Sequence, residues 1–334
     1  MKAIHVNWTK PYFERQRLRG HGFEVMKNST SNTYDLTDFQ ILYTMASIIE
    51  WKYHMEQEDG RPGPIKLHTD TVGANYYQSL GILDLYDEVD VNFLNGYSKS
   101  NIDAAYFWTS GKIKCLAHQN EPFVFLDQDM IINEPLPDYT YENDLTIAHW
   151  EIGRGYYYFD KEKWDKEIKH IEWPKNYDEN DWSPNTSFLQ FNNIKILREY
   201  HEWHKKLVTT NGEDIPEWFW LFTDQGILGH IIRENDYKIN TLTNKIALSH
   251  HNTTLDDERY KGKAEKWYLP ENPDLDKETS FDHVWLDKIG YNQDSKKYDV
   301  LKNHWFQLIV GRGYSSFLHN ERFKKYWDEF NKNN

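Results

Sequence analysis

Two carboxylates directly after an apolar stretch are the sharpest chemical feature of this sequence. Residues 123–132 read FVFLDQDMII, so a strand expected at 122–126 is followed by Asp127 and Asp129. Side chains two apart on extended backbone point the same way. Adjacent carboxylates repel one another unless a proton or a cation lies between them, and their hard oxygen atoms suit Mg²⁺ or Mn²⁺. The pattern predicts a divalent metal site, although an ordinary acidic turn after a strand fits the same letters.

Several common enzyme signatures are absent from the chain. No Gly-x-Gly-x-x-Gly follows the first strand, so dinucleotide binding is unsupported. No Gly-x-x-x-x-Gly-Lys-(Ser/Thr) marks a nucleoside triphosphatase. Gly-x-Ser-x-Gly, the usual serine-hydrolase signal, is also missing. The segment 201–204, HEWH, lacks the two-residue gap of a zinc-protease motif.

Strands and helices alternate through about the first 130 residues. We expect strands at 3–6, 65–69, 89–94 and 122–126, and helices after the capping-box residues 37–40, at 71–81 and at 100–118. Such alternation predicts an α/β fold with a mostly parallel, Rossmann-type sheet flanked by helices. Ligands of open α/β sheets bind beyond the carboxyl ends of the strands, where Asp127 and Asp129 lie.

The second part of the chain has a less regular pattern. It predicts strands at 145–149 and 187–191, helices at 194–207 and 215–232, and a long charged surface loop at 256–277. No linker marks a domain boundary, so we expect one domain over 1–334.

Composition narrows the classes of function. The chain has 334 residues with 39 Lys and Arg against 53 Asp and Glu, a net charge of −14 that argues against binding nucleic acid. One cysteine, Cys115, excludes an intramolecular disulfide and suits a reducing compartment. No apolar run approaches the ~18 residues of a membrane span, so a cytoplasmic protein is expected. Aromatic residues make up 16%, which suits stacking on sugar rings or filling a core.

Four segments, in this order, resemble the GT-A fold nucleotide-sugar glycosyltransferases. The first is Asp127-x-Asp129, which resembles that family's metal site. Residues 185–192, NTSFLQFN, are similar to a strand bordering its acceptor site, with Ser187 where glycine is usual. Residues 223–228, TDQGIL, resemble the Asp-Gln-x-x-Leu helix of the group containing glycogenin and lipopolysaccharide galactosyltransferases. Residues 281–288, FDHVWLDK, are similar to a late metal- and diphosphate-binding segment, but lack its glycine and are one residue shorter.

The resemblance implies a role for each matching residue. These are metal ligation by Asp127, Asp129 and His283, nucleotide or diphosphate binding by Asp70, Asp127 and Lys288, substrate binding by Asn185 and Thr186, and catalysis by Asp224 and Gln225. The adjacent His250 and His251 compete with His283 for the metal. A histidine ligand favours Mn²⁺ over Mg²⁺.

The resemblance therefore implies a GT-A-like, metal-dependent and retaining hexosyltransferase. Its donor would be a nucleotide sugar, UDP-linked by family habit, and its acceptor a glycan, glycolipid or surface-polysaccharide precursor. Residues 1–130 would form the nucleotide-binding half, and 131–334 the acceptor-side half with a C-terminal extension. A glycoside hydrolase and a non-catalytic sugar- or nucleotide-binding protein remain alternatives.

Two Gly-Arg-Gly segments, 153–155 and 311–313, complete the candidate features. A guanidinium between glycines can clamp a phosphate, but a tight turn explains both segments and is the preferred interpretation.

Overall fold

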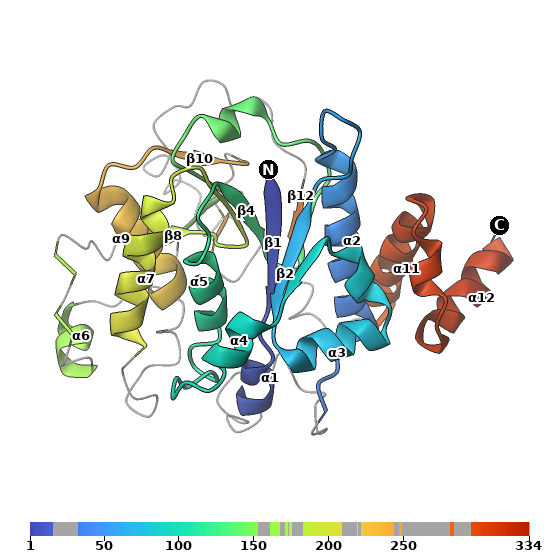
Figure 1. Cartoon of the computed structure of the whole chain (residues 1–334), viewed down its shortest axis with the longest axis horizontal. Helices are drawn as coiled ribbons and strands as arrows, with labels where there is room; N and C mark the ends of the chain where they lie inside the picture. The colour runs from blue at the N-terminus through green and yellow to red at the C-terminus, as the bar shows by residue number, and fades with distance from the viewer. Residues whose placement is uncertain are drawn as a thin grey trace.

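A seven-stranded sheet with helices on both faces forms the body of the protein (Figure 1). The structure, a computed structural model, describes residues 1–15, 33–152, 161–167, 171–172, 174–175, 183–208, 219, 222–243, 247–248, 281–283 and 295–333. The strand order is β10-β6-β9-β4-β1-β2-β3. The bounds are β1 Lys2–Asn7, β2 Ile65–Thr69, β3 Glu88–Asp90, β4 Phe123–Leu126, β6 Leu145–Ile147, β9 Phe188–Phe191 and β10 Ile239–Thr241.

The sheet is mostly parallel. β1 pairs in parallel with β2 and β4, β2 with β3, and β6 with β10. β9 is antiparallel to both β4 and β6, so it alone runs against the other strands of this sheet. The expected fold class, α/β with a mostly parallel sheet flanked by helices, is confirmed.

Both faces of the sheet are buried, as a central parallel sheet requires. On β4, Val124 and Leu126 belong to one hydrophobic cluster, and Phe123 and Phe125 to another. The first cluster lies under α2 (Asp38–His54) and α11 (Ser295–Gly311), and the second under α7 (Lys195–Leu207) and α9 (Ile227–Glu234). The alternation of side chains along one strand thus holds a helical layer on each face.

Two small sheets flank the large one. β12 (Phe281–His283) pairs antiparallel with β5 (Met130–Ile132), and β7 (Trp150–Ile152) joins β11 (Ala247–Leu248) to β8 (Ser183–Pro184). The remaining elements are α1 Lys10–Arg15, α3 Thr71–Ser79, η3 Ile82–Leu85, α4 Asn92–Tyr97, α5 Ser110–Leu116, η4 Asp138–Tyr141, α6 Lys161–Glu167, η6 Phe222–Gly226, η9 Ser315–Leu318, η10 Glu321–Phe323 and α12 Lys324–Asn333.

The capping box expected at the start of α2 is present. Thr37 accepts a hydrogen bond from the Gln40 backbone through its side chain, and the Gln40 side chain accepts one from the Thr37 backbone. The α2 helix then packs against β5 on one side and α11 on the other. This packing explains why most of its side chains are buried.

Two predicted elements were wrong in extent. The strand expected at 89–94 ends with β3 at Asp90, because Asp90 Oδ1 accepts hydrogen bonds from the backbone of Asn92 and Phe93 and starts α4. The helix expected over 100–118 is confined to α5, because Asp103 Oδ1 accepts from the Ala105 backbone and makes a turn instead. The loop expected at 256–277 and the first residues of the helix expected at 215–232 lie outside the described residues.

None of the helices in the described ranges is both long and apolar enough to cross a membrane.

Candidate active site

The two aspartates after β4 lie in a tight turn rather than on extended backbone. The Asp127 backbone N–H donates to the Ser187 carbonyl at 2.7 Å, and the Met130 N–H donates to the Asp127 carbonyl at 2.9 Å. Asp129 is 4% exposed, whereas Asp127 is only partly buried. The turn connects β4 to β5, so both carboxylates lie at the carboxyl edge of the central sheet.

Strand β12 brings His283 to this turn. Its antiparallel register sets His283 opposite Met130, the first residue of β5. His283 Nε2 lies 3.9 Å from Asp129 Oδ2, which is too long for a hydrogen bond. Two candidate metal ligands from distant parts of the sequence are therefore neighbours.

The described residues do not hold a complete metal cluster. Across the ranges given above, no group of three or more His, Cys, Asp and Glu side chains is gathered closely enough to bind a metal ion. The Asp129–His283 contact is the part of the expected donor set that is assembled. Lys288, His250 and His251 lie outside the described residues.

Asp224 is the centre of a buried polar network. Lys112 Nζ donates to Asp224 Oδ2 at 2.9 Å, and Thr186 Oγ1 donates to the same oxygen at 3.0 Å. Tyr200 Oη donates to Asp224 Oδ1 at 2.5 Å. Lys112 Nζ also donates to Thr186 Oγ1 at 3.0 Å, which closes the network. The substrate residue Thr186 and the catalytic residue Asp224 of the sequence prediction are thus in direct contact.

A π-helical turn displays Asp224 and Gln225. Residues 222–226 form the π-helix η6, which continues into α9. Tyr200 Oη also lies 2.9 Å from the backbone carbonyl of Asp224 and can share its one proton between the two oxygens, so α7 holds this irregular turn in place. Single π turns within helices are frequent at functional sites. Gln225 is 8% exposed, and its Oε1 has no hydrogen-bond partner among the described residues.

Lys112 gives the acidic site its positive charge. Burial lowers the pKa of this lysine, but the carboxylates of Asp224, Asp127 and Asp129 outweigh burial and raise the pKa above its ordinary value. Lys112 therefore stays protonated. Burial, and next the Asp224 carboxylate, raise the pKa of Tyr200 well above its ordinary value, so Tyr200 remains a hydrogen-bond donor.

Asn185 is oriented by its own turn and by a buried acid. Its Oδ1 accepts hydrogen bonds from the Ser187 backbone at 3.0 Å and from the Ser187 hydroxyl. Its Nδ2 donates to Glu151 Oε1 at 2.5 Å. Glu151 is 7% exposed, and its Oε2 has no hydrogen-bond partner among the described residues. Ser187 therefore helps to fix the orientation of the Asn185 side chain.

Asp70 caps a helix. Its Oδ1 accepts from the Gly73 backbone at 3.0 Å at the start of α3, and its Oδ2 accepts from the Thr9 backbone at 2.9 Å and the Thr9 hydroxyl at 2.8 Å. These bonds join the carboxyl ends of β1 and β2. The structure accounts for Asp70 as a structural group, and its expected contact with a nucleotide stays a prediction.

The second Gly-Arg-Gly segment is a turn, as preferred. Gly313 has φ +86°, a left-handed conformation that favours glycine. Arg312 donates to both carboxylate oxygens of Glu50, at 2.7 and 2.8 Å, and its guanidinium lies 3.5 Å from the centre of the Tyr53 ring. Residues 153–155 lie outside the described residues.

Three residues of the site were missed from the sequence: Lys112, Glu151 and Tyr200. A signal existed for Lys112, because Cys115 and Leu116 lie three and four residues later, on the same buried face of α5. No local pattern distinguishes Tyr200 or Glu151 from other residues of a helix or a strand.

Comparison with known proteins places the chain in a family. The family described as "Family of unknown function (DUF6734)" matches residues 1–269. The chain belongs to this family. No curated protein matches it.

Several solved structures of glycosyltransferases are similar to this member of the family. The galactosyltransferase LgtC, solved with donor and acceptor sugar analogues, is 12% identical with a TM-score of 0.38, over 85% of this chain and 86% of that one. Mouse xyloside xylosyltransferase 1 is 10% identical with a TM-score of 0.41, over 85% and 97%. GlyE of Streptococcus pneumoniae TIGR4 is 14% identical with a TM-score of 0.35, over 92% and 64%. Identities and TM-scores this low assign no activity to this chain.

Proposed function

We propose that this protein is a metal-dependent glycosyltransferase that moves a sugar from a nucleoside-diphosphate sugar to a glycan, glycolipid or surface-polysaccharide precursor. The observation that carries the proposal is the contact of His283 with Asp129, two residues after Asp127, at the carboxyl edge of the sheet. This edge is where open α/β sheets bind their ligands. The Lys112–Asp224 network extends the same site, because Lys112 interacts electrostatically with Asp127 and Asp129.

The donor set suits Mn²⁺ or Mg²⁺ in kind. Asp127 and Asp129 supply carboxylate oxygens and His283 an imidazole nitrogen, which favours Mn²⁺. When bound, such a cation would stabilise the charge on the departing diphosphate as a Lewis acid. The assembled Asp129–His283 contact, 3.9 Å between Oδ2 and Nε2, is what supports this assignment.

Asp224 and Gln225 supply the polar groups of the sugar side. Lys112, Thr186 and Tyr200 fix the Asp224 carboxylate, so it is preorganised toward one orientation. The Gln225 amide oxygen is available to accept a hydrogen bond from a sugar hydroxyl. We propose, by the resemblance of this Asp-Gln pair, that transfer retains the anomeric configuration and that the sugar is a hexose.

Glu151 is the acid that we place toward the acceptor. Its Oε1 is held by Asn185, whereas its Oε2 is available to accept a hydrogen bond from a hydroxyl group. A buried acceptor of this kind is satisfied when a polyhydroxylated ligand binds. The acceptor is therefore expected to contact β7 and the 185–187 turn.

Thermal unfolding with UDP, GDP and CDP, each with and without Mn²⁺, tests the proposal. A nucleotide at ~100 times its Kd stabilises the folded state by about 2.7 kcal/mol. We expect a shift that requires one nucleotide together with the metal, UDP by the resemblance. Asp129→Asn is expected to abolish the shift, because it removes a carboxylate from the cation site.

Asp84 is an exposed aspartate on η3, so Asp84→Asn is the matched control. This variant is expected to keep the full increase in melting temperature with nucleotide and Mn²⁺. Equal shifts in the two variants would exclude Asp129 as a metal ligand. If no nucleotide changes the melting temperature of the wild type, the proposal of a nucleotide-sugar donor is wrong.

A further inference from the structure

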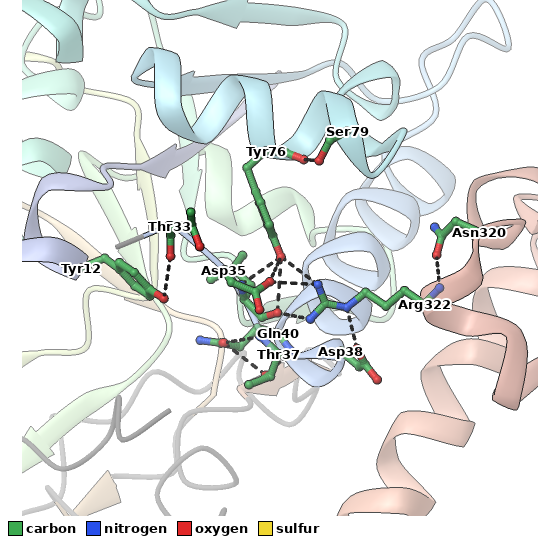
Figure 2. Close-up of polar contacts among 11 residues, drawn as sticks. Tyr12, Thr33, Asp35, Thr37, Asp38, Gln40, Tyr76, Ser79, Asn320 and Arg322 are labelled. Atoms are coloured by element: carbon green, nitrogen blue, oxygen red, sulfur yellow. Dashed lines mark hydrogen bonds and ion pairs between the residues drawn. The ribbon is translucent and has the colours of Figure 1, made fainter. Parts of the chain in front are cut away.

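Arg322 is the hub of a polar network that joins two distant parts of the chain (Figure 2). Its Nε donates to Asp38 Oδ1 at 2.6 Å, and its Nη1 contacts Asp35 Oδ1 at 3.0 Å. Nη1 also donates to Tyr76 Oη at 3.1 Å, and Nη2 donates to the Leu36 carbonyl. Every nitrogen of this guanidinium therefore contacts residues 35–38 or α3.

Neighbours of Arg322 strengthen the same junction. Lys325 pairs with Asp38 at 3.2 Å, and Tyr326 Oη donates to Asp38 Oδ2 at 3.2 Å. Burial lowers the pKa of the Arg322 guanidinium, but the hydrogen bonds to Asp38 and Asp35 outweigh burial and raise it, so the arginine stays charged. A guanidinium bound to several groups at once fixes geometry better than a single exposed ion pair.

The segment that Arg322 holds reaches the carboxyl edge of the sheet. Tyr34, one residue before Asp35, donates its hydroxyl to Asn7 Oδ1 at 2.9 Å. Asn7 is the last residue of β1 and is 7% exposed, and its Nδ2 has no hydrogen-bond partner among the described residues. The Tyr34 ring also meets the Tyr76 and Tyr12 rings edge-on, with centroids 5.1 and 4.9 Å apart.

We propose that Arg322 is a positioning residue for the nucleotide side of the active site. Through residues 35–36 it fixes Tyr34, and through Tyr34 it fixes Asn7 at the end of β1. The inference rests on the proposed function. It assigns a task to a residue outside residues 1–269, which the family model matches.

A second arginine of the C-terminal helices provides the control. Arg312 binds Glu50 near the end of α2, whereas Arg322 binds Asp38 at its start. Both arginines attach the C-terminal helices to α2, but only Arg322 contacts the segment that carries Tyr34. Loss of attachment alone would affect the two variants alike.

Arg322→Gln and Arg312→Gln in the full chain test the proposal with two measurements. Without nucleotide, amide hydrogen exchange in residues 33–37 is expected to be faster in Arg322→Gln than in the wild type. In the wild type the Leu36 amide donates to Tyr76 Oη at 2.9 Å, a hydrogen bond that the variant is expected to weaken. The Kd of the stabilising nucleotide with Mn²⁺ is expected to rise about tenfold in Arg322→Gln and less than about twofold in Arg312→Gln. Arg322→Lys is expected to fall between, because one ammonium cannot reach all of these partners.

Unchanged exchange in residues 33–37 of Arg322→Gln would overturn the proposal. Equal rises in Kd for the two glutamine variants would also overturn it, because they would show a general loss of attachment. If the wild type binds none of the nucleotides, the proposed function fails, and the exchange measurement still decides whether Arg322 orders Tyr34.

Discussion

Asp70 and Asp224 are both buried aspartates at the carboxyl side of the sheet, yet their partners differ. Asp70 accepts from two backbone N–H groups, of Thr9 and Gly73, and from one hydroxyl. Asp224 accepts from three side chains, those of Lys112, Thr186 and Tyr200.

The difference separates an acid held mainly by backbone donors from an acid held entirely by side chains. Backbone donors are fixed by the fold, so Asp70 holds the ends of β1 and β2 and the start of α3 together. The three side-chain donors fix the Asp224 carboxylate, and the charged Lys112 also interacts electrostatically with Asp127 and Asp129. Asp224 therefore belongs to one electrostatic unit with Lys112, Asp127 and Asp129.

The largest expected effect is that of removing the buried cation. Lys112→Met leaves the Asp224 carboxylate buried without a positive partner, which typically costs about 3–5 kcal/mol. The double variant Lys112→Met/Asp224→Asn is expected to recover much of this loss, because neither charge remains. Urea denaturation of the single and double variants measures the coupling. Additive losses would mean that the two side chains do not act as a unit.

Asp224→Asn is expected to lower donor turnover about hundredfold, equivalent to about 2.7 kcal/mol. The amide keeps the size of the side chain but loses the charge. The rate at which the nucleotide is released from its nucleotide sugar measures this effect, with the nucleotide chosen as the one that stabilises the wild type. Turnover at the wild-type rate would contradict a catalytic role for Asp224.

Asp70→Ala is expected to destabilise the fold by about 1–3 kcal/mol, since it removes the cap of α3 and the link to Thr9. Turnover by the variant below its melting temperature should remain within a few-fold of the wild type. A large loss of nucleotide affinity in the folded variant would contradict a purely structural role, because it would indicate that Asp70 contacts the nucleotide.

His204 predicts a pH dependence beside Asp224. Its Nε2 lies 2.8 Å from Ser110 Oγ, and burial lowers the pKa of His204 from 6.5 to about 4. His204 therefore takes up a proton near pH 6.5 in the unfolded chain but only near pH 4 in the folded protein. The free energy of unfolding consequently decreases as the pH falls from about 6.5 toward 4. Between pH 7 and 5 this amounts to about 1–2 kcal/mol. We expect His204→Gln to reduce this pH dependence in denaturation experiments, whereas His304→Gln, at an exposed position, leaves it unchanged.

Ser187→Gly is expected to have the smallest effect, under about 1 kcal/mol of stability. The variant introduces the glycine that the resemblance leads one to expect here, and it removes the hydroxyl that donates to Asn185. A modest rise in acceptor KM at constant kcat would confirm that Ser187 orients Asn185. A large loss of stability would show that Ser187 supports the turn itself.

Much of the fold followed from local patterns. The capping box at Thr37, the apolar run at 123–126 and the alternation of strands and helices each gave an element that the structure contains. The limits of these patterns lie where a side chain competes for the backbone. Asp90 and Asp103 ended or replaced predicted elements, because each accepts from the backbone N–H groups that follow it.

The sequence by itself determined the α/β class and the types of residue available for chemistry, because alternation and strand-end carboxylates are local properties. The tertiary structure decided which of them meet. Only the pairing of β12 with β5 brings His283 to Asp129, and only the packing of α5 and α7 on the sheet brings Lys112 and Tyr200 to Asp224. Contacts between residues far apart in the chain depend on register and on packing of whole elements, which no short window of sequence contains.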